Sequence, residues 1–102
     1  MKPPFVLIEL DKTRTLKLNT AAIMRAEEKL GIRIPQEFGG GTGELVILMW
    51  SALKEDTPAI TISQVQGFFD EYGYETCANA LGEAIQRAYT ATKTEGDGEK
   101  NE

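Results

Sequence analysis

Histidine is absent from this sequence of 102 residues, and cysteine occurs once, as Cys77. The absence of histidine removes the commonest general base and the commonest zinc ligand. One cysteine cannot form an internal disulfide, and Cys77 falls on the apolar stripe of a predicted helix, as a buried structural thiol does. We therefore expect a protein that is not an enzyme and that binds no metal or other cofactor.

Positive charge and long apolar runs are also scarce. The chain has 11 Lys and Arg residues against 16 Asp and Glu residues, a formal net charge of −5 at pH 7. Nucleic acids and anionic lipids bind clusters of Lys and Arg, so we expect neither as a partner. No apolar run approaches the roughly 20 residues that span a bilayer. The start MKPPFVLIELDK also lacks the apolar segment of a secretory signal, so we expect a cytoplasmic protein.

What is present is typical of one small globular domain, with 41% hydrophobic and 26% charged residues. A chain of this length can form a single core. Its last residues, ATKTEGDGEKNE, contain no apolar residue after Ala91. We predict one α+β domain over residues 1–90 and a disordered acidic tail over residues 91–102.

The order of patterns predicts an N-terminal β-hairpin followed by a bundle of about four α-helices. The hairpin spans about residues 4–18, and the apolar residues on both sides of its first strand favour a strand that is covered on both faces. Helices are expected over about residues 20–30, from Thr42 or Gly43 to about residue 54, from a capping box at Thr61 to a stop at Gly73, and over about residues 75–90. On the first helix Arg25, Glu28 and Lys29 are expected to point away from the core.

The stretch Glu44–Leu53, ELVILMWSAL, contains six consecutive large apolar residues and should be the centre of the core. A buried strand is the alternative to a helix, and the lack of β-branched residues after Ile47 favours the helix. Ile47 and Leu48 flank its polar line, and they would join a binding surface if the fold left them uncovered. The inner face of this helix comprises Val46, Met49, Trp50 and Leu53, and its polar outer line comprises Glu44, Ser51 and Glu55.

Two groups of apolar side chains are candidates for binding a protein partner. The loop of residues 31–43 is too apolar in places to be fully solvated, so it either packs onto the domain or awaits a partner. The aromatic residues around Gly73 form either part of the core or a docking patch. The candidate protein-binding residues are Ile32, Ile34, Phe38, Phe69, Tyr72 and Tyr74.

Two stretches that look like ligand-binding motifs lack their essential residues. The glycines of residues 39–43 are followed by Glu44, where a phosphate-binding loop needs lysine and then Ser or Thr. The acidic segment of residues 53–64 lacks the first acidic ligand, the turn glycine and the final glutamate of a calcium loop. Neither stretch predicts a binding site.

Several short motifs, taken in their order and spacing, resemble the tail assembly chaperones of long-tailed bacteriophages and of the related gene transfer agents. These motifs are Thr15–Asn19 running into Ala26–Gly31, Leu48–Leu53, and Thr61–Val65 through Tyr72–Gly73. The resemblance implies a small, non-enzymatic, largely helical protein with N-terminal strands. It further implies binding to the tape measure protein, the tail tube protein, or both, in the host cytoplasm, and absence from the mature virion.

Other interpretations stay open at this stage. A structural protein retained in the particle, such as a minor tail protein or head–tail connector, is the first alternative, and a small enzyme or metal-binding domain is the second. The family resemblance also allows a longer, frameshifted form that continues beyond Thr90. Small residues on the last predicted helix would let another helix approach closely, so a homo-oligomer is a further possibility.

Overall fold

The computed structural model describes the backbone of residues 5–101 and the side chains of residues 5–89. It has the predicted α+β fold, an N-terminal antiparallel hairpin followed by four helices. The last helix was predicted to end near residue 90, and its backbone is described as helical to Asn101. The side chains of the tail predicted over residues 91–102 lie outside the described residues. The elements are β1 (Phe5–Glu9), β2 (Thr13–Lys17), α1 (Thr20–Leu30), α2 (Thr42–Lys54), α3 (Ile62–Tyr72) and α4 (Tyr74–Asn101).

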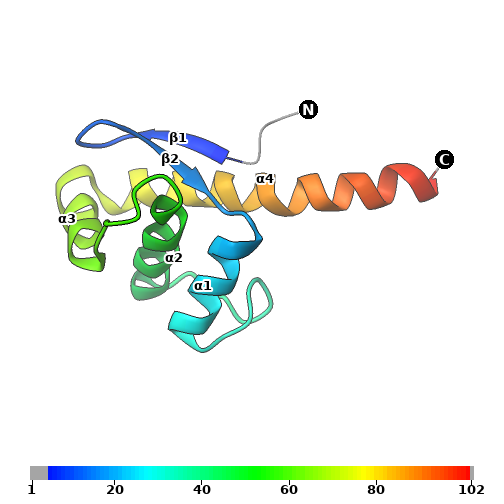
Figure 1. The fold of residues 1–102 in the computed structure, drawn as a ribbon, viewed down its shortest axis with the longest axis horizontal. Coiled ribbons are helices and arrows are strands. Elements are labelled where there is room, and N and C mark those ends of the chain that lie inside the picture. Colours follow the sequence, from blue (N-terminus) through cyan, green and yellow to red (C-terminus); the bar gives the residue numbers. More distant parts are fainter. Residues whose placement is uncertain (1–4, 102) are drawn as a thin grey trace.

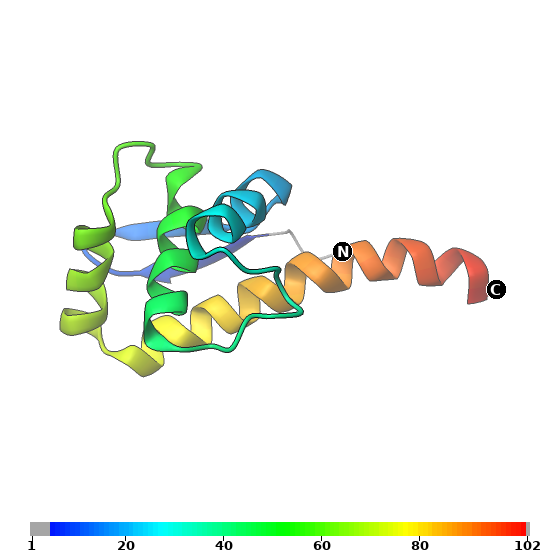
Figure 2. The same ribbon diagram turned by 90° about the horizontal axis from the view of Figure 1, so that it is seen from below.

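The hairpin and α4 lie across one side of the molecule, and α3, α2 and α1 lie side by side against them (Figures 1 and 2). Helix α2 contacts β2, α1, α3 and α4, and so occupies the centre. Leu48, Met49 and Ala52 of this helix are completely buried. The prediction of a central core helix is therefore confirmed. Trp50, which was expected on its inner face, is only half-buried.

The hairpin is covered on one face only, so the expectation that both faces of its first strand are covered is wrong. Val6 pairs with Leu16 across the two strands, and both side chains are buried, whereas the side chain of Leu7 is 62% exposed. Side chains on a strand alternate between the faces of a sheet, and both α2 and α4 pack on the same face of this one. The apolar residues of the second face therefore remain in contact with solvent.

One charged side chain lies on the covered face. Arg14 of β2 is only 9% exposed, and its guanidinium forms two hydrogen bonds, of 2.7 and 2.8 Å, with the Asp11 carboxylate. The same guanidinium lies 5.2 Å from the centre of the Phe68 ring in α3. The ion pair and the cation–π contact compensate for the loss of water around the charge.

The helix boundaries follow the predicted capping chemistry. Gly31 ends α1 in the left-handed conformation, with φ of 72°, which glycine adopts without steric cost. At the start of α3, Thr61 and Gln64 form the predicted capping box: the Gln64 N–H donates to Thr61 Oγ1, and the Thr61 N–H donates to Gln64 Oε1.

Two members of the polar line of α2, Ser51 and Glu55, face α1 rather than solvent, which corrects the prediction for them. Ser51 is completely buried, and its hydroxyl donates a hydrogen bond of 2.6 Å to the carbonyl of Ala22 in α1. Ala22, Ala26 and Ala52 are also buried in this region. Small side chains let two helices approach closely, and the serine hydroxyl finds a backbone acceptor at that distance.

Arg25 likewise points toward α2 and not away from it. Its Nη1 donates to the Ser51 carbonyl at 2.9 Å, and its Nη2 pairs with Glu55 Oε2 at 2.8 Å. Asn19 donates a further hydrogen bond to the other oxygen of Glu55. The pKa of Glu55 is lowered mainly by the hydrogen bond from Arg25 and, to a smaller extent, by the one from Asn19. Residues expected on two solvent-exposed faces thus form one polar contact between α1 and α2.

Substitution of Ser51 by Leu should lower the free energy of unfolding by about 1–3 kcal/mol, because the larger side chain would push α1 away from α2. Ser63→Leu, at an exposed position of α3, should change it by less than about 0.5 kcal/mol. Urea denaturation of both variants measures the difference. Equal effects would contradict the close packing of α1 on α2.

The stability should fall as the pH drops from about 5 toward 2. The folded pKa of Glu55 lies below that of the unfolded chain, so the unfolded chain takes up its proton first. The stabilisation is complete above the unfolded pKa and is lost as the pH falls through the folded one. Glu55→Gln should weaken this pH dependence, whereas Glu28→Gln, at an exposed position of α1, should preserve it. Urea midpoints at several pH values provide the test, and identical pH profiles for the two variants would refute it.

Candidate functional site

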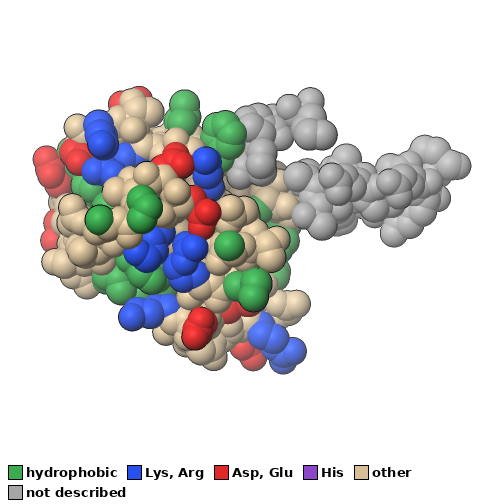
Figure 3. Space-filling model, in the orientation of Figure 1, with side chains coloured by type: hydrophobic (Ala, Val, Ile, Leu, Met, Phe, Trp, Pro, Cys, Tyr) green, Lys and Arg blue, Asp and Glu red, His purple; other side chains and the backbone are tan. Residues whose placement is uncertain are grey.

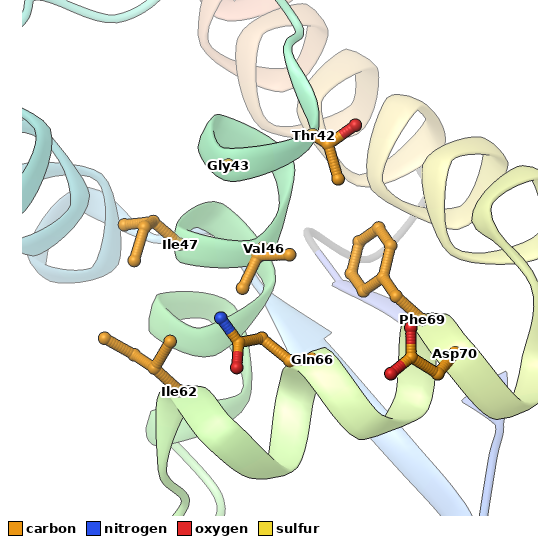
Figure 4. A pocket seen from close by; sticks show the side chains of 8 residues that line it. All are labelled: Thr42, Gly43, Val46, Ile47, Ile62, Gln66, Phe69 and Asp70. Carbon is orange, nitrogen blue, oxygen red and sulfur yellow. The ribbon is translucent and has the colours of Figure 1, made fainter.

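An open groove of about 480 Å³ lies between the N-terminal half of α2 and the exposed side of α3 (Figure 4). The two helices run in opposite directions in Figure 2, and in Figure 4 the Phe69 ring, near the end of α3, points toward Thr42 at the start of α2. The lining residues are Thr42, Gly43, Val46 and Ile47 of α2 and Ile62, Gln66, Phe69 and Asp70 of α3. We call this feature the α2–α3 groove.

The α2–α3 groove has an apolar floor and a polar rim. Val46 and Phe69 are 6% and 8% exposed and form the floor, while Ile47 and Ile62 are half-buried at one end. The polar members of the lining, among them Gln66 and Asp70, are exposed. An apolar centre inside a polar border is the usual composition of a protein-binding surface.

The local sequence explains why the groove stays open at the start of α2. Gly43 has no side chain, and a Cβ atom built there would meet no atom within 4 Å. The neighbouring backbone is fixed by Glu44, whose carboxylate accepts hydrogen bonds from the N–H groups of Gly39 at 2.8 Å and Gly41 at 3.2 Å. The glycine-rich segment is therefore held in place by a helix residue, and it leaves the groove unfilled.

A half-buried tryptophan, Trp50, lies next to the isoleucine end of the α2–α3 groove. Trp50 lies one turn after Ile47 on α2, and its indole N–H donates to the Ile60 carbonyl at 3.2 Å, two residues before Ile62. The Nζ atoms of Lys29 and Lys54 lie 5.8 and 5.5 Å from the centre of the Trp50 ring. Figure 3 shows a hydrophobic surface bordered by Lys and Arg side chains where α1, α2 and α3 meet. We call Trp50 with its two lysines the Trp50 face.

The six predicted binding residues occupy two separate places. Phe69 packs its ring against Tyr74, with centroids 6.4 Å apart, while the carbonyl of Ile34 accepts a hydrogen bond of 3.3 Å from Tyr89. Tyr74 and Tyr89 are separated by about 22 Å along α4, at 1.5 Å per residue. The six residues therefore do not form one continuous surface.

Burial divides these six residues further. Ile34 and Phe69 are 7% and 8% exposed and belong to the core. Ile32, Phe38 and Tyr72 are partly buried against it, and Tyr74 is 50% exposed. At Ile34 the loop packs onto the domain, and the backbone N–H of Ile34 donates to Glu27 Oε2 at 2.9 Å. Phe69 is the member of the set that lines the α2–α3 groove, and the binding role of the six stays a prediction.

Sequence reasoning missed most of the groove. The sequence predicts a binding role for Ile47 and Leu48 only if the fold leaves them uncovered. Ile47 is partly exposed in the groove, whereas Leu48 is completely buried. Neither Ile62 nor Gln66 was among the predicted binding residues. The available signal was that Ile62, Gln66 and Phe69 share one face of α3, but which helix lies opposite that face depends on the tertiary fold.

Cys77 and the acidic side chains of the described residues form no separate site. Cys77 is completely buried, and burial raises the pKa of its thiol. Among the residues that the structure describes, no group of His, Cys, Asp and Glu side chains could hold a metal ion. The described helices also include none that combines the length and the apolar character needed to cross a membrane.

Comparisons of the chain with protein-family models, with curated proteins and with solved structures found no match. The resemblance to tail assembly chaperones therefore rests on the short sequence motifs. The α2–α3 groove is the structural feature from which a function can be argued.

Alanine substitution should separate the core role of Phe69 from the surface position of Tyr74. Phe69→Ala should lower the free energy of unfolding by about 3–5 kcal/mol, because it removes a buried ring and leaves a cavity. Tyr74→Ala, which removes a half-exposed ring in contact with Phe69, should cost less than about 1.5 kcal/mol. Chemical denaturation measures both values. A loss for Phe69→Ala no larger than that for Tyr74→Ala would exclude Phe69 from the core.

Proposed function

We propose that this protein is a tail assembly chaperone of a long-tailed bacteriophage or gene transfer agent. It binds the tape measure protein, the tail tube protein, or both, during tail assembly, and it catalyses no reaction. The observation that carries the proposal is the α2–α3 groove, with the half-buried Ile47 and Ile62 above a floor of Val46 and Phe69. The proposed family, and with it the identity of the partners, comes from the resemblance of the ordered sequence motifs to tail assembly chaperones.

The chemistry of the groove supports binding over catalysis. Asp70 is the single ionisable side chain in its lining. General acid–base or nucleophilic catalysis requires a reactive group held by a hydrogen-bonded partner. The lining offers an isolated, exposed carboxylate beside apolar side chains, an arrangement that suits the burial of a partner's apolar residues.

The size of the groove supports a transient complex. A stable protein interface buries about 1,200–2,000 Å² in total. A groove of about 480 Å³ receives only a few side chains. Release of the chaperone after assembly requires such limited contact, and we propose that the protein acts in the host cytoplasm and is absent from the mature virion.

Co-expression with the tail tube and tape measure proteins of the same phage or gene transfer agent should recover at least one of them with the tagged protein. Affinity purification followed by mass spectrometry of the eluate is the measurement. Recovery of neither partner would argue strongly against the proposal. Mass spectrometry of purified particles provides the second test, because a protein retained there in stoichiometric amount would be a minor tail or connector protein instead.

A further inference from the structure

The Trp50 face adjoins the isoleucine end of the α2–α3 groove along α2. Ile47 lines the groove, Trp50 follows one helical turn later, and Lys54 follows one turn after that. The distance from Thr42 to Lys54 along the helix is about 18 Å at 1.5 Å per residue. A partner segment of about three helical turns has this length.

The charge at the Trp50 end is unbalanced. The chain carries a net charge of −5, yet Lys29 and Lys54 form no ion pair with any carboxylate in the described part of the chain. The cations that do form ion pairs are Arg14, Lys17, Arg25 and Arg87. The Lys54 ammonium donates a hydrogen bond to the Pro58 carbonyl, but neither lysine is neutralised by a carboxylate. Two such positive charges beside one aromatic ring favour carboxylates on whatever covers that ring.

The backbone of the surface selects the conformation of its occupant. Both walls of the groove are helices, whose N–H and C=O groups are already bonded within α2 and α3, apart from those at the helix ends. An extended segment would find no sheet edge here to pair with. A helical segment satisfies its own backbone and needs only to place apolar side chains between Val46, Ile47 and Ile62.

We propose that this surface binds one amphipathic α-helix of the client protein, with its apolar side chains in the α2–α3 groove and its acidic side chains next to Lys29 and Lys54. The identity of the client that supplies this helix rests on the proposed function. The surface itself is defined by the groove, the tryptophan and the two lysines. Its occupancy is measurable without the client.

Trp50 is the only tryptophan in the chain, so its fluorescence reports on this surface directly. The full-length protein is titrated with two synthetic 18-residue amphipathic helical peptides that share one apolar stripe. One carries glutamates in its first and last turns, and the other carries lysines there, so that the result does not depend on the direction of the bound helix. The glutamate peptide should bind about 3- to 10-fold more tightly, the effect of two exposed charge pairs. Raising the salt concentration should reduce this preference.

Charge reversal tests the role of the lysines. The double variant Lys29→Glu, Lys54→Glu should bind the lysine peptide more tightly than the glutamate peptide. Lys12→Glu combined with Arg33→Glu is the matched control, because it changes the net charge equally at exposed positions outside the groove lining and the Trp50 face. The control should retain the wild-type preference for the glutamate peptide.

Filling the groove tests the role of its apolar floor. Gly43→Phe adds a ring inside the groove, and Gly82→Phe adds the same ring on an exposed part of α4. Both glycines are helical, and a Cβ atom at either would meet no atom within 4 Å. Neither variant should lower the melting temperature, since glycine is the poorer helix former. Gly43→Phe should weaken binding of the glutamate peptide at least tenfold, and Gly82→Phe should leave it unchanged.

The inference is overturned if the wild-type protein binds neither peptide, if it binds both equally, or if Gly43→Phe binds like the wild type. Co-purification with the client separates this inference from the proposed function. If the client is recovered with the wild type and equally well with the charge-reversed variant, the function stands and this surface is wrong. If the peptides show the expected preference but no tail protein is recovered, the helix-binding surface stands and the tail chaperone function fails.

Discussion

The burial of α2 is the constraint on which the rest of the structure depends. Its run of large apolar residues cannot face water, and a fully buried Leu or Met side chain contributes about 1.5–3 kcal/mol relative to exposure. Leu48, Met49 and Leu53 are at most 1% exposed, which requires cover from several directions. The hairpin strand β2 and the helices α1, α3 and α4 provide that cover. Each of these elements is amphipathic because one of its faces lies against α2 or against a neighbour of α2.

The contact between α1 and α2 shows how a polar side chain can belong to such a core. Ser51 interrupts the apolar surface of α2, and the small side chains around it bring α1 close enough for its hydroxyl to reach the Ala22 carbonyl. Arg25 and Glu55 then close the edge of the contact with an ion pair. Hydrogen-bonding groups that would be costly if buried alone are paired with one another, and they fix the position of α1 along α2.

The α2–α3 groove is the place where the cover of α2 is incomplete. The connection after Lys54 brings α3 back along α2, and Trp50 fixes this return through its hydrogen bond to Ile60. Farther along, Gly43 presents no side chain, and the two helices leave Val46 and Phe69 at the bottom of an open space. An incomplete cover costs little stability because these two residues are still more than nine-tenths buried. It leaves a surface with both apolar depth and lysines at its end.

The sequence by itself determined the elements, since strand alternation, helical periodicity and the caps at Gly31, Thr61 and Gly73 are local properties of the chain. It also determined that α2 is central, because no other stretch has so many consecutive apolar residues. Only the tertiary structure decided which faces meet. Leu7 faces solvent because the helices pack on one side of the hairpin, and Ser51 is buried because α1 packs against the polar line of α2. The groove likewise arises from residues of two helices whose spacing no local pattern encodes, so the sequence identified Phe69 and Ile47 but not the surface that they share.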